Sequence, residues 1–112
     1  MSLRAGLAGL LWLLAGRAGA GAPDPERQRA LIELLRQDCG SCHGMTLQGG
    51  LGPALLPDSL AGKGDSLLVQ TILNGRPGTA MPPWRSFLSE AEAAWLVAQL
   101  RQGPKAPGSP SP

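Results

Sequence analysis

The sequence predicts a small all-α domain, and three observations lead to that prediction. Apolar residues recur at helical spacing in three segments, at about residues 25–39, 65–75 and 89–103. Capping residues, proline or glycine bound each of these segments. Val, Ile and Thr, the residues that favour strands, total only seven in a chain of 112 residues. A β-sheet is therefore not expected.

Residues 1–20 are predicted to be a secretory signal peptide. Arg4 supplies the positive start, residues 5–16 form an apolar run, and residues 18–20 match a small-residue cleavage site. The apolar run is too short for a bilayer, which takes about 20 residues. We therefore expect secretion into the periplasm, with no stable membrane span in the mature protein. An uncleaved anchor is the alternative, because Arg17 separates the apolar run from the cleavage site.

The mature chain is predicted to be one folded domain, residues 21–102, followed by a flexible Pro-rich tail, residues 103–112. The tail contains four prolines, two glycines and two serines and cannot bury enough apolar surface to order itself. Removal of the signal peptide takes away two arginines and leaves eight basic and eight acidic residues. The resulting formal charge of zero gives no indication of a nucleic-acid partner. We expect a monomer.

The first segment is predicted to be an amphipathic helix that begins at Asp24-Pro25. Asp is a favoured N-cap, and proline is tolerated at the first helical position because its missing N–H would have no partner there. Apolar residues then follow at spacings of three and four as far as Cys39. The helix therefore leads the chain directly into its most informative motif.

That motif is Cys39-Gly40-Ser41-Cys42-His43, the C-x-x-C-H pattern of covalent c-type haem attachment. It contains both cysteines and the single histidine of the chain. Positions i, i+3 and i+4 share one side of a helix, so both thiols and the imidazole would face the same way. We predict one haem c bound through thioethers to Cys39 and Cys42, with His43 as an iron ligand.

Two other interpretations of the motif fit this chain less well than haem attachment. A structural zinc site takes four ligands, and no second Cys/His pair exists in the chain. A thioredoxin-like redox motif also uses C-x-x-C, but it requires a βαβ context that this composition disfavours. Thiol–disulfide chemistry at Cys39 and Cys42 is kept as an alternative.

Residues 44–64 are predicted to be a loop, because glycines and prolines interrupt them repeatedly. We expect this loop to wrap the haem edge, and we expect the Pro53 carbonyl to accept a hydrogen bond from His43. A helix capped by Asp65 or Ser66 and stopped by Gly75 should follow. Its predicted buried residues are Leu67, Leu68, Thr71 and Ile72.

Met81 is the predicted second axial ligand of the iron. Prolines at positions 77, 82 and 83 exclude a regular helix, so Met81 lies on a stiff extended segment. It follows His43 by enough chain to reach the opposite haem face, whereas Met45 is too close to His43 in the sequence to reach that face.

The last helix begins with the capping box Ser89-Glu90-Ala91-Glu92. Its apolar face is expected to pack on the first helix.

The chain resembles the small monohaem class I cytochromes c. The residues that carry the resemblance are Cys39 to Gly44, Gly52-Pro53, Gly78 to Trp84 and Leu88 to Glu92. Within that family it is most similar to the periplasmic subgroup that accompanies the haem-d-containing nitrite reductase of denitrifying bacteria. The strings that suggest this subgroup are Arg36 to Cys39 and Asn74 to Trp84.

The resemblance implies a class I cytochrome c fold, with helices wrapped around one covalently attached haem, and His43 and Met81 as axial iron ligands. It also implies an electron-transfer protein rather than an enzyme, which serves nitrite reductase in denitrification or the maturation of its haem d. Its partners would then be redox proteins. A haem-binding sensor or peroxidase-like protein with an open axial position is a further alternative.

Overall fold

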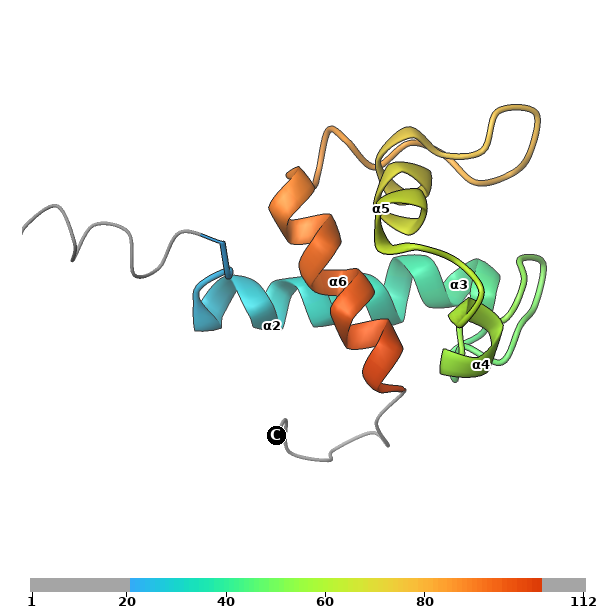
Figure 1. Cartoon of the computed structure of the whole chain (residues 1–112), viewed down its shortest axis with the longest axis horizontal. Coiled ribbons are helices and arrows are strands. Elements are labelled where there is room, and N and C mark those ends of the chain that lie inside the picture. The colour runs from blue at the N-terminus through green and yellow to red at the C-terminus, as the bar shows by residue number, and fades with distance from the viewer. Residues whose placement is uncertain (1–20, 104–112) are drawn as a thin grey trace, which may run out of the picture.

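Helices supply the regular structure of the computed structural model, which describes residues 21–103. No strand is present within that range, so the prediction of an all-α fold is confirmed (Figure 1). Within the same range, every helix is too short or too polar to cross a lipid bilayer. The predicted signal peptide and the predicted tail after Gly103 lie outside the described residues.

The first helical run is continuous from Pro25 to His43 and comprises three elements. These elements are α2 (Pro25–Leu34), the π-helical turn η1 (Leu35–Cys39) and α3 (Gly40–His43). Asp24 is the N-cap, and its carboxylate accepts a hydrogen bond from the Arg27 N–H, as the sequence predicted. Leu31 and Leu35 are the buried residues of its first two elements. The haem-attachment motif thus lies at the C-terminal end of this run.

The predicted loop over residues 44–64 contains a short helix that the sequence analysis missed, α4 (Pro57–Leu60). Proline stands at its first position, where it costs no hydrogen bond. The guanidinium of Arg101 holds the segment after α4, because it donates to the carbonyls of Leu60 (3.2 Å) and Lys63 (2.6 Å). A contact across such a distance in the chain has no local sequence signal.

Helix α5 (Asp65–Asn74) begins where expected but with a different cap. Gly64 is the N-cap, and no side chain caps the helix, so the prediction that Asp65 or Ser66 does so is wrong. The Asp65 carboxylate instead accepts a hydrogen bond from Arg101 Nε at 2.6 Å. Gly75 ends the helix, as predicted, with a positive φ of 68°.

The buried face of α5 also differs from the prediction. Val69 and Leu73 are buried, Leu68 and Ile72 pack against them, and Leu67 is 56% exposed. The core face is therefore turned by about one residue, or about 100°, from the face that was predicted. Five apolar residues on α5 offer two possible stripes, and only the contact with another helix selects one.

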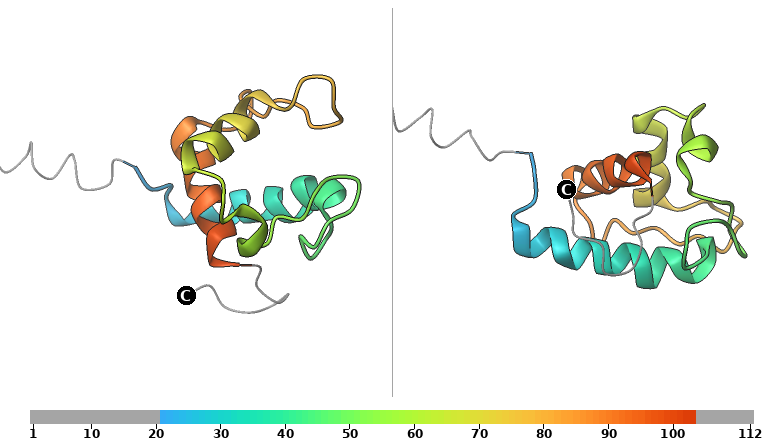
Figure 2. Two further views of the ribbon diagram at one scale, coloured as in Figure 1. Left: turned by 45° about the vertical axis from the view of Figure 1, so that its right-hand side comes forward. Right: turned by 90° about the horizontal axis from the view of Figure 1, so that it is seen from below.

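That neighbour is α6 (Glu90–Gln102), which crosses both α5 and α2 (Figures 1 and 2). The capping box is present in full: Ser89 Oγ accepts from the Glu92 N–H, and the Glu92 carboxylate accepts from the Ser89 N–H. The expected apolar face of α6 is buried, and its buried residues are Ala93, Leu96, Val97 and Leu100. They pack mainly on α5 and less on α2, so the expected partner helix was only partly right.

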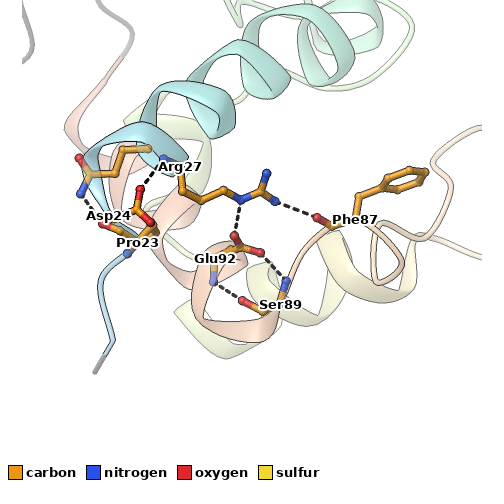
Figure 3. Close-up of polar contacts among 7 residues, drawn as sticks. Pro23, Asp24, Arg27, Phe87, Ser89 and Glu92 are labelled. Atoms are coloured by element: carbon orange, nitrogen blue, oxygen red, sulfur yellow. Dashed lines mark hydrogen bonds and ion pairs between the residues drawn. The ribbon is translucent and has the colours of Figure 1, made fainter. Parts of the chain in front are cut away.

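An ion pair joins the start of α6 to the start of α2. Arg27 donates through Nε to the Glu92 carboxylate and through Nη2 to the Phe87 carbonyl, at 3.0 Å for the second contact (Figure 3). The same carboxylate closes the capping box, so one acidic group fixes both the helix start and the crossing of two helices. The ion pair and the hydrogen bond to Ser89 lower the pKa of Glu92.

Candidate haem-binding site

The helical run from Pro25 places both thiols and the imidazole on adjoining turns. Cys39 is the last residue of η1, and Cys42 and His43 belong to α3. Both cysteine side chains are half-buried, whereas Ser41 between them is exposed. The Ser41 hydroxyl donates to the Asp38 carbonyl at 2.8 Å. The motif therefore presents two sulfurs and one imidazole, with its polar residue bonded back to the helix.

The His43 side chain is oriented by the loop that follows it. Its Nδ1 atom lies 2.7 Å from the Pro53 carbonyl oxygen, which confirms the predicted contact. A carbonyl oxygen only accepts hydrogen bonds, so Nδ1 carries the proton and the Nε2 lone pair is available. This is the usual arrangement of a metal-ligating histidine, whose second nitrogen donates to a fixed acceptor.

Gly52 permits the close approach of this loop to the imidazole. A Cβ atom at Gly52 would lie 2.9 Å from Cε1 and Nδ1 of His43. The Gly52 N–H also donates to the Cys42 carbonyl at 2.8 Å, and the Gly49 N–H donates to the His43 carbonyl at 2.8 Å. The last carbonyls of α3 are thus satisfied by the same loop that holds the histidine.

Met81 lies on the segment between α5 and α6, and this segment is fixed at its base. The Arg76 N–H donates to the Met81 carbonyl at 3.2 Å, and Thr79 Oγ1 accepts from the Met81 N–H at 3.3 Å. The N–H groups of Trp84 and Arg85 donate to the last carbonyls of α5. Met81 itself is half-buried.

This segment and the loop after His43 project at the same end of the molecule, beyond α6, in both views of Figure 2 and in Figure 1. Met45 has a different environment. It is 65% exposed, and its sulfur lies against Gly40, 3.4 Å from where a Cβ would stand. Of these two methionines, Met81 therefore has the environment expected of a ligand.

The environment of Cys39 does not favour thiolate chemistry. Burial, and then the nearby Asp38 carboxylate, raise the pKa of the Cys39 thiol to about 11. Reactive cysteines of C-x-x-C motifs have lowered pKa values, commonly at a helix N-terminus. Here the helix begins fourteen residues before Cys39, at Pro25, so no helix N-terminus faces the thiol. The structure gives no support to the thiol–disulfide alternative.

Three positioning features were not found by the sequence analysis. They are the close approach of Gly52 to His43, the contact of Gly75 with the Met81 segment, and the hydrogen bonds from Arg85 to the Asn74 side chain. Each joins residues through the fold rather than through a motif. The sequence offered little signal for them: Gly52 adjoins the predicted acceptor Pro53, and Gly75 was expected only to stop a helix.

The donor set of this region fits a c-type haem. Two thiols on adjoining helical turns can form the thioethers, and the neighbouring imidazole has Nε2 free because Nδ1 is bonded to Pro53. Methionine sulfur is the common second ligand of haem iron in electron-transfer cytochromes. The residues that would hold the group are thus Cys39, Cys42, His43 and Met81.

Comparison with known proteins identifies the family. The model of the cytochrome c oxidase, cbb3-type, subunit III family matches residues 26–100. Cytochrome c55X of Pseudomonas aeruginosa is 59% identical over 85 residues, which are 76% of this chain and 71% of the relative. Among solved structures, the c-type cytochrome NirC is 57% identical, with a TM-score of 0.70 over 71% of this chain and 94% of that one.

A second solved structure contains the same fold as part of a larger protein. Dihydro-heme d1 dehydrogenase NirN, in complex with DHE, is 42% identical, with a TM-score of 0.60 over 71% of this chain and 17% of that one. The family model covers most of the present chain, and the relatives of similar size match most of their own length. The chain therefore belongs to the c-type cytochromes, in the group that contains cytochrome c55X and NirC.

Proposed function

We propose that the protein is a periplasmic carrier of single electrons with one haem c, bound through Cys39 and Cys42. His43 and Met81 would be the axial ligands of its iron. The observation that carries the proposal is the hydrogen bond between His43 Nδ1 and the Pro53 carbonyl, which orients the imidazole and leaves Nε2 for iron. The two thiols on the adjoining turns supply the covalent attachment.

When bound, the haem supplies a one-electron Fe(III)/Fe(II) couple. The Pro53 carbonyl fixes the His43 ring, and the turn between Arg76 and Met81 positions the thioether. Axial methionine raises the reduction potential, as in other cytochromes c. Because His43 and Met81 would both bind the iron, no coordination site would be left for a substrate, which favours an electron carrier over an enzyme.

The partners proposed are enzymes of haem d1 chemistry. A module 45% identical to this chain over 71 residues forms 14% of the dihydro-heme d1 dehydrogenase of Pseudomonas aeruginosa. This relative supports a role beside such enzymes, either in electron supply to nitrite reductase or in maturation of its haem d. Redox encounters of this kind have small interfaces and are weak, which suits a monomeric carrier.

The test is expression of the full chain in a bacterium that attaches c-type haem, followed by intact mass and absorption spectra. The proposal expects the polypeptide mass plus one haem, a low-spin spectrum and slow binding of carbon monoxide to the ferrous protein. Rapid carbon monoxide binding would instead favour a sensor or peroxidase-like protein with an open axial site. A colourless product with titratable Cys39 and Cys42 thiols would overturn haem binding altogether.

A further inference from the structure

The π-helical turn η1 directly precedes the haem-attachment motif. Its closing hydrogen bond runs from the Gly40 N–H to the Leu35 carbonyl, five residues back rather than four. A π turn of this kind amounts to one extra residue within an α-helix, and such turns are frequent at functional sites. Residues Leu35 to Cys39 contain neither proline nor glycine, so local sequence supplies no obvious cause for the irregularity.

Tertiary contacts hold both sides of this turn. On the N-terminal side, Leu31 and Leu35 are buried in the core, with exposed fractions of 0% and 9%. On the C-terminal side, the carbonyls of Cys42 and His43 accept hydrogen bonds from the following loop, and the His43 ring is bonded to Pro53. Arg36, Gln37 and Asp38 between these anchors are exposed. The turn is therefore held by buried and loop contacts at its two ends, whereas its middle residues make only exposed contacts.

The extra residue changes the rotation of the motif relative to the core. In an uninterrupted α-helix of about 100° per residue, His43 would lie about 120° around the axis from Leu31, Cys39 about 80° and Cys42 about 20°. With one residue absorbed by the π turn, His43 and Cys39 lie within about 20° of Leu31 and Cys42 about 80° to the other side. The whole motif is thus turned back by roughly a quarter of a revolution.

We infer that η1 is a positioning device for haem attachment: the extra residue between Leu35 and Cys39 sets the direction of the thiols and of His43 relative to the core face of α2. The inference rests on the proposed function, because it concerns where the bound group would lie. The rotation of the motif is set by how many residues lie between Leu35 and Cys39, and not by the side chains of Arg36, Gln37 and Asp38. Only the residue count should matter, since these side chains point to solvent.

The first test is deletion of Gln37, which removes the extra residue and no buried contact. The expected result is at least tenfold less covalently attached haem per polypeptide, measured by intact mass. Gln37→Ala keeps the residue count and should stay within twofold of wild type. A compensated variant, with Gln37 deleted and one alanine inserted after Leu35, should recover attachment. Haem content equal to wild type in the deletion, or no recovery in the compensated variant, would overturn the inference.

The second test uses the wild-type holoprotein and does not depend on any variant folding. The scalar coupling across the hydrogen bond should connect the Gly40 amide nitrogen to the Leu35 carbonyl carbon in NMR spectra of the ferrous protein. A coupling to the Arg36 carbonyl would show an ordinary α turn and would refute the inference while leaving the proposed function standing. Absence of haem from wild type and all variants would refute both.

Discussion

A Cβ atom at Gly75 would stand 2.7 Å from the carbonyl oxygen of Met81 and equally close to the backbone of Pro82 and Pro83. The backbone of residues 81–83 therefore packs directly against Gly75, the residue that ends α5. Gly75 also has a φ of 68°, which residues other than glycine rarely adopt. The position of Met81, the proposed iron ligand, thus depends on the absence of a Cβ atom at Gly75, six residues earlier.

Gly75→Ala should displace the Met81 segment and alter the axial ligation of the iron. A backbone with this φ and a ψ of −170° is almost exclusive to glycine and costs a residue with a Cβ about 1–3 kcal/mol, and the clash adds to that. We expect a partly high-spin absorption spectrum and faster carbon monoxide binding. Gly78→Ala is the matched control, since Gly78 has a φ of 79° and no atom within 4 Å of its Cβ position. Equal spectra for the two variants would argue against the Gly75 contact.

Met81→Ala should remove the second axial ligand. We expect a changed spin state, a lower reduction potential and rapid carbon monoxide binding, because the thioether that raises the potential is gone. Absorption spectroscopy and a redox titration measure these effects. Met45→Ala, at an exposed methionine beside Gly40, should leave both unchanged. A wild-type spectrum from Met81→Ala would exclude Met81 as a ligand.

Gly52→Ala should weaken the hold of the loop on His43, because the new methyl group would lie 2.9 Å from the imidazole ring. Loss of the Nδ1–Pro53 hydrogen bond makes the imidazole a poorer donor, so the ferric state loses stabilisation and the reduction potential rises. A redox titration of the holoprotein tests this. Gly62→Ala, with no atom within 4 Å of its Cβ position, is the control and should not shift the potential.

Leu73→Ala tests the buried face of α5. Leu73 is fully buried, so its truncation should lower the free energy of unfolding by about 2–5 kcal/mol. Chemical denaturation of the holoprotein, followed by circular dichroism, gives the value. Leu67→Ala on the exposed side should cost much less. If Leu67 proved the more costly of the two, α5 would be turned the other way.

The Arg27–Glu92 ion pair predicts an acid-sensitive contribution to stability. Arg27 and the Ser89 N–H lower the pKa of Glu92 in the folded state. The Glu92 carboxylate therefore binds a proton more readily in the unfolded state than in the folded state. The contribution is therefore present above the ordinary glutamate pKa and is lost as pH falls through the lower folded value. Glu92→Gln should remove this part of the pH dependence of unfolding. Glu90→Gln, at an exposed residue of the same turn, should retain it.

Local sequence determined where most helices begin and end. Asp24-Pro25, the box from Ser89 to Glu92 and the stop at Gly75 act through hydrogen bonds and dihedral angles within a few residues, so they could be predicted without the fold. The same holds for the motif from Cys39 to His43, whose spacing alone brings the thiols and the imidazole together. The Pro53 acceptor was also predicted, because a histidine that binds iron usually donates its second N–H to a fixed acceptor.

The tertiary structure alone decided how these elements face one another. Helix α5 has two apolar stripes. Packing against α6 buries the stripe with Val69 and Leu73 and not the predicted stripe that begins at Leu67. Asp65 was expected to cap that helix, but a distant arginine on α6 engages it instead. The π turn follows the same rule, since buried leucines on one side and the histidine loop on the other fix its ends. Rotation about a helix axis has no local cost, so only long-range contacts could determine it.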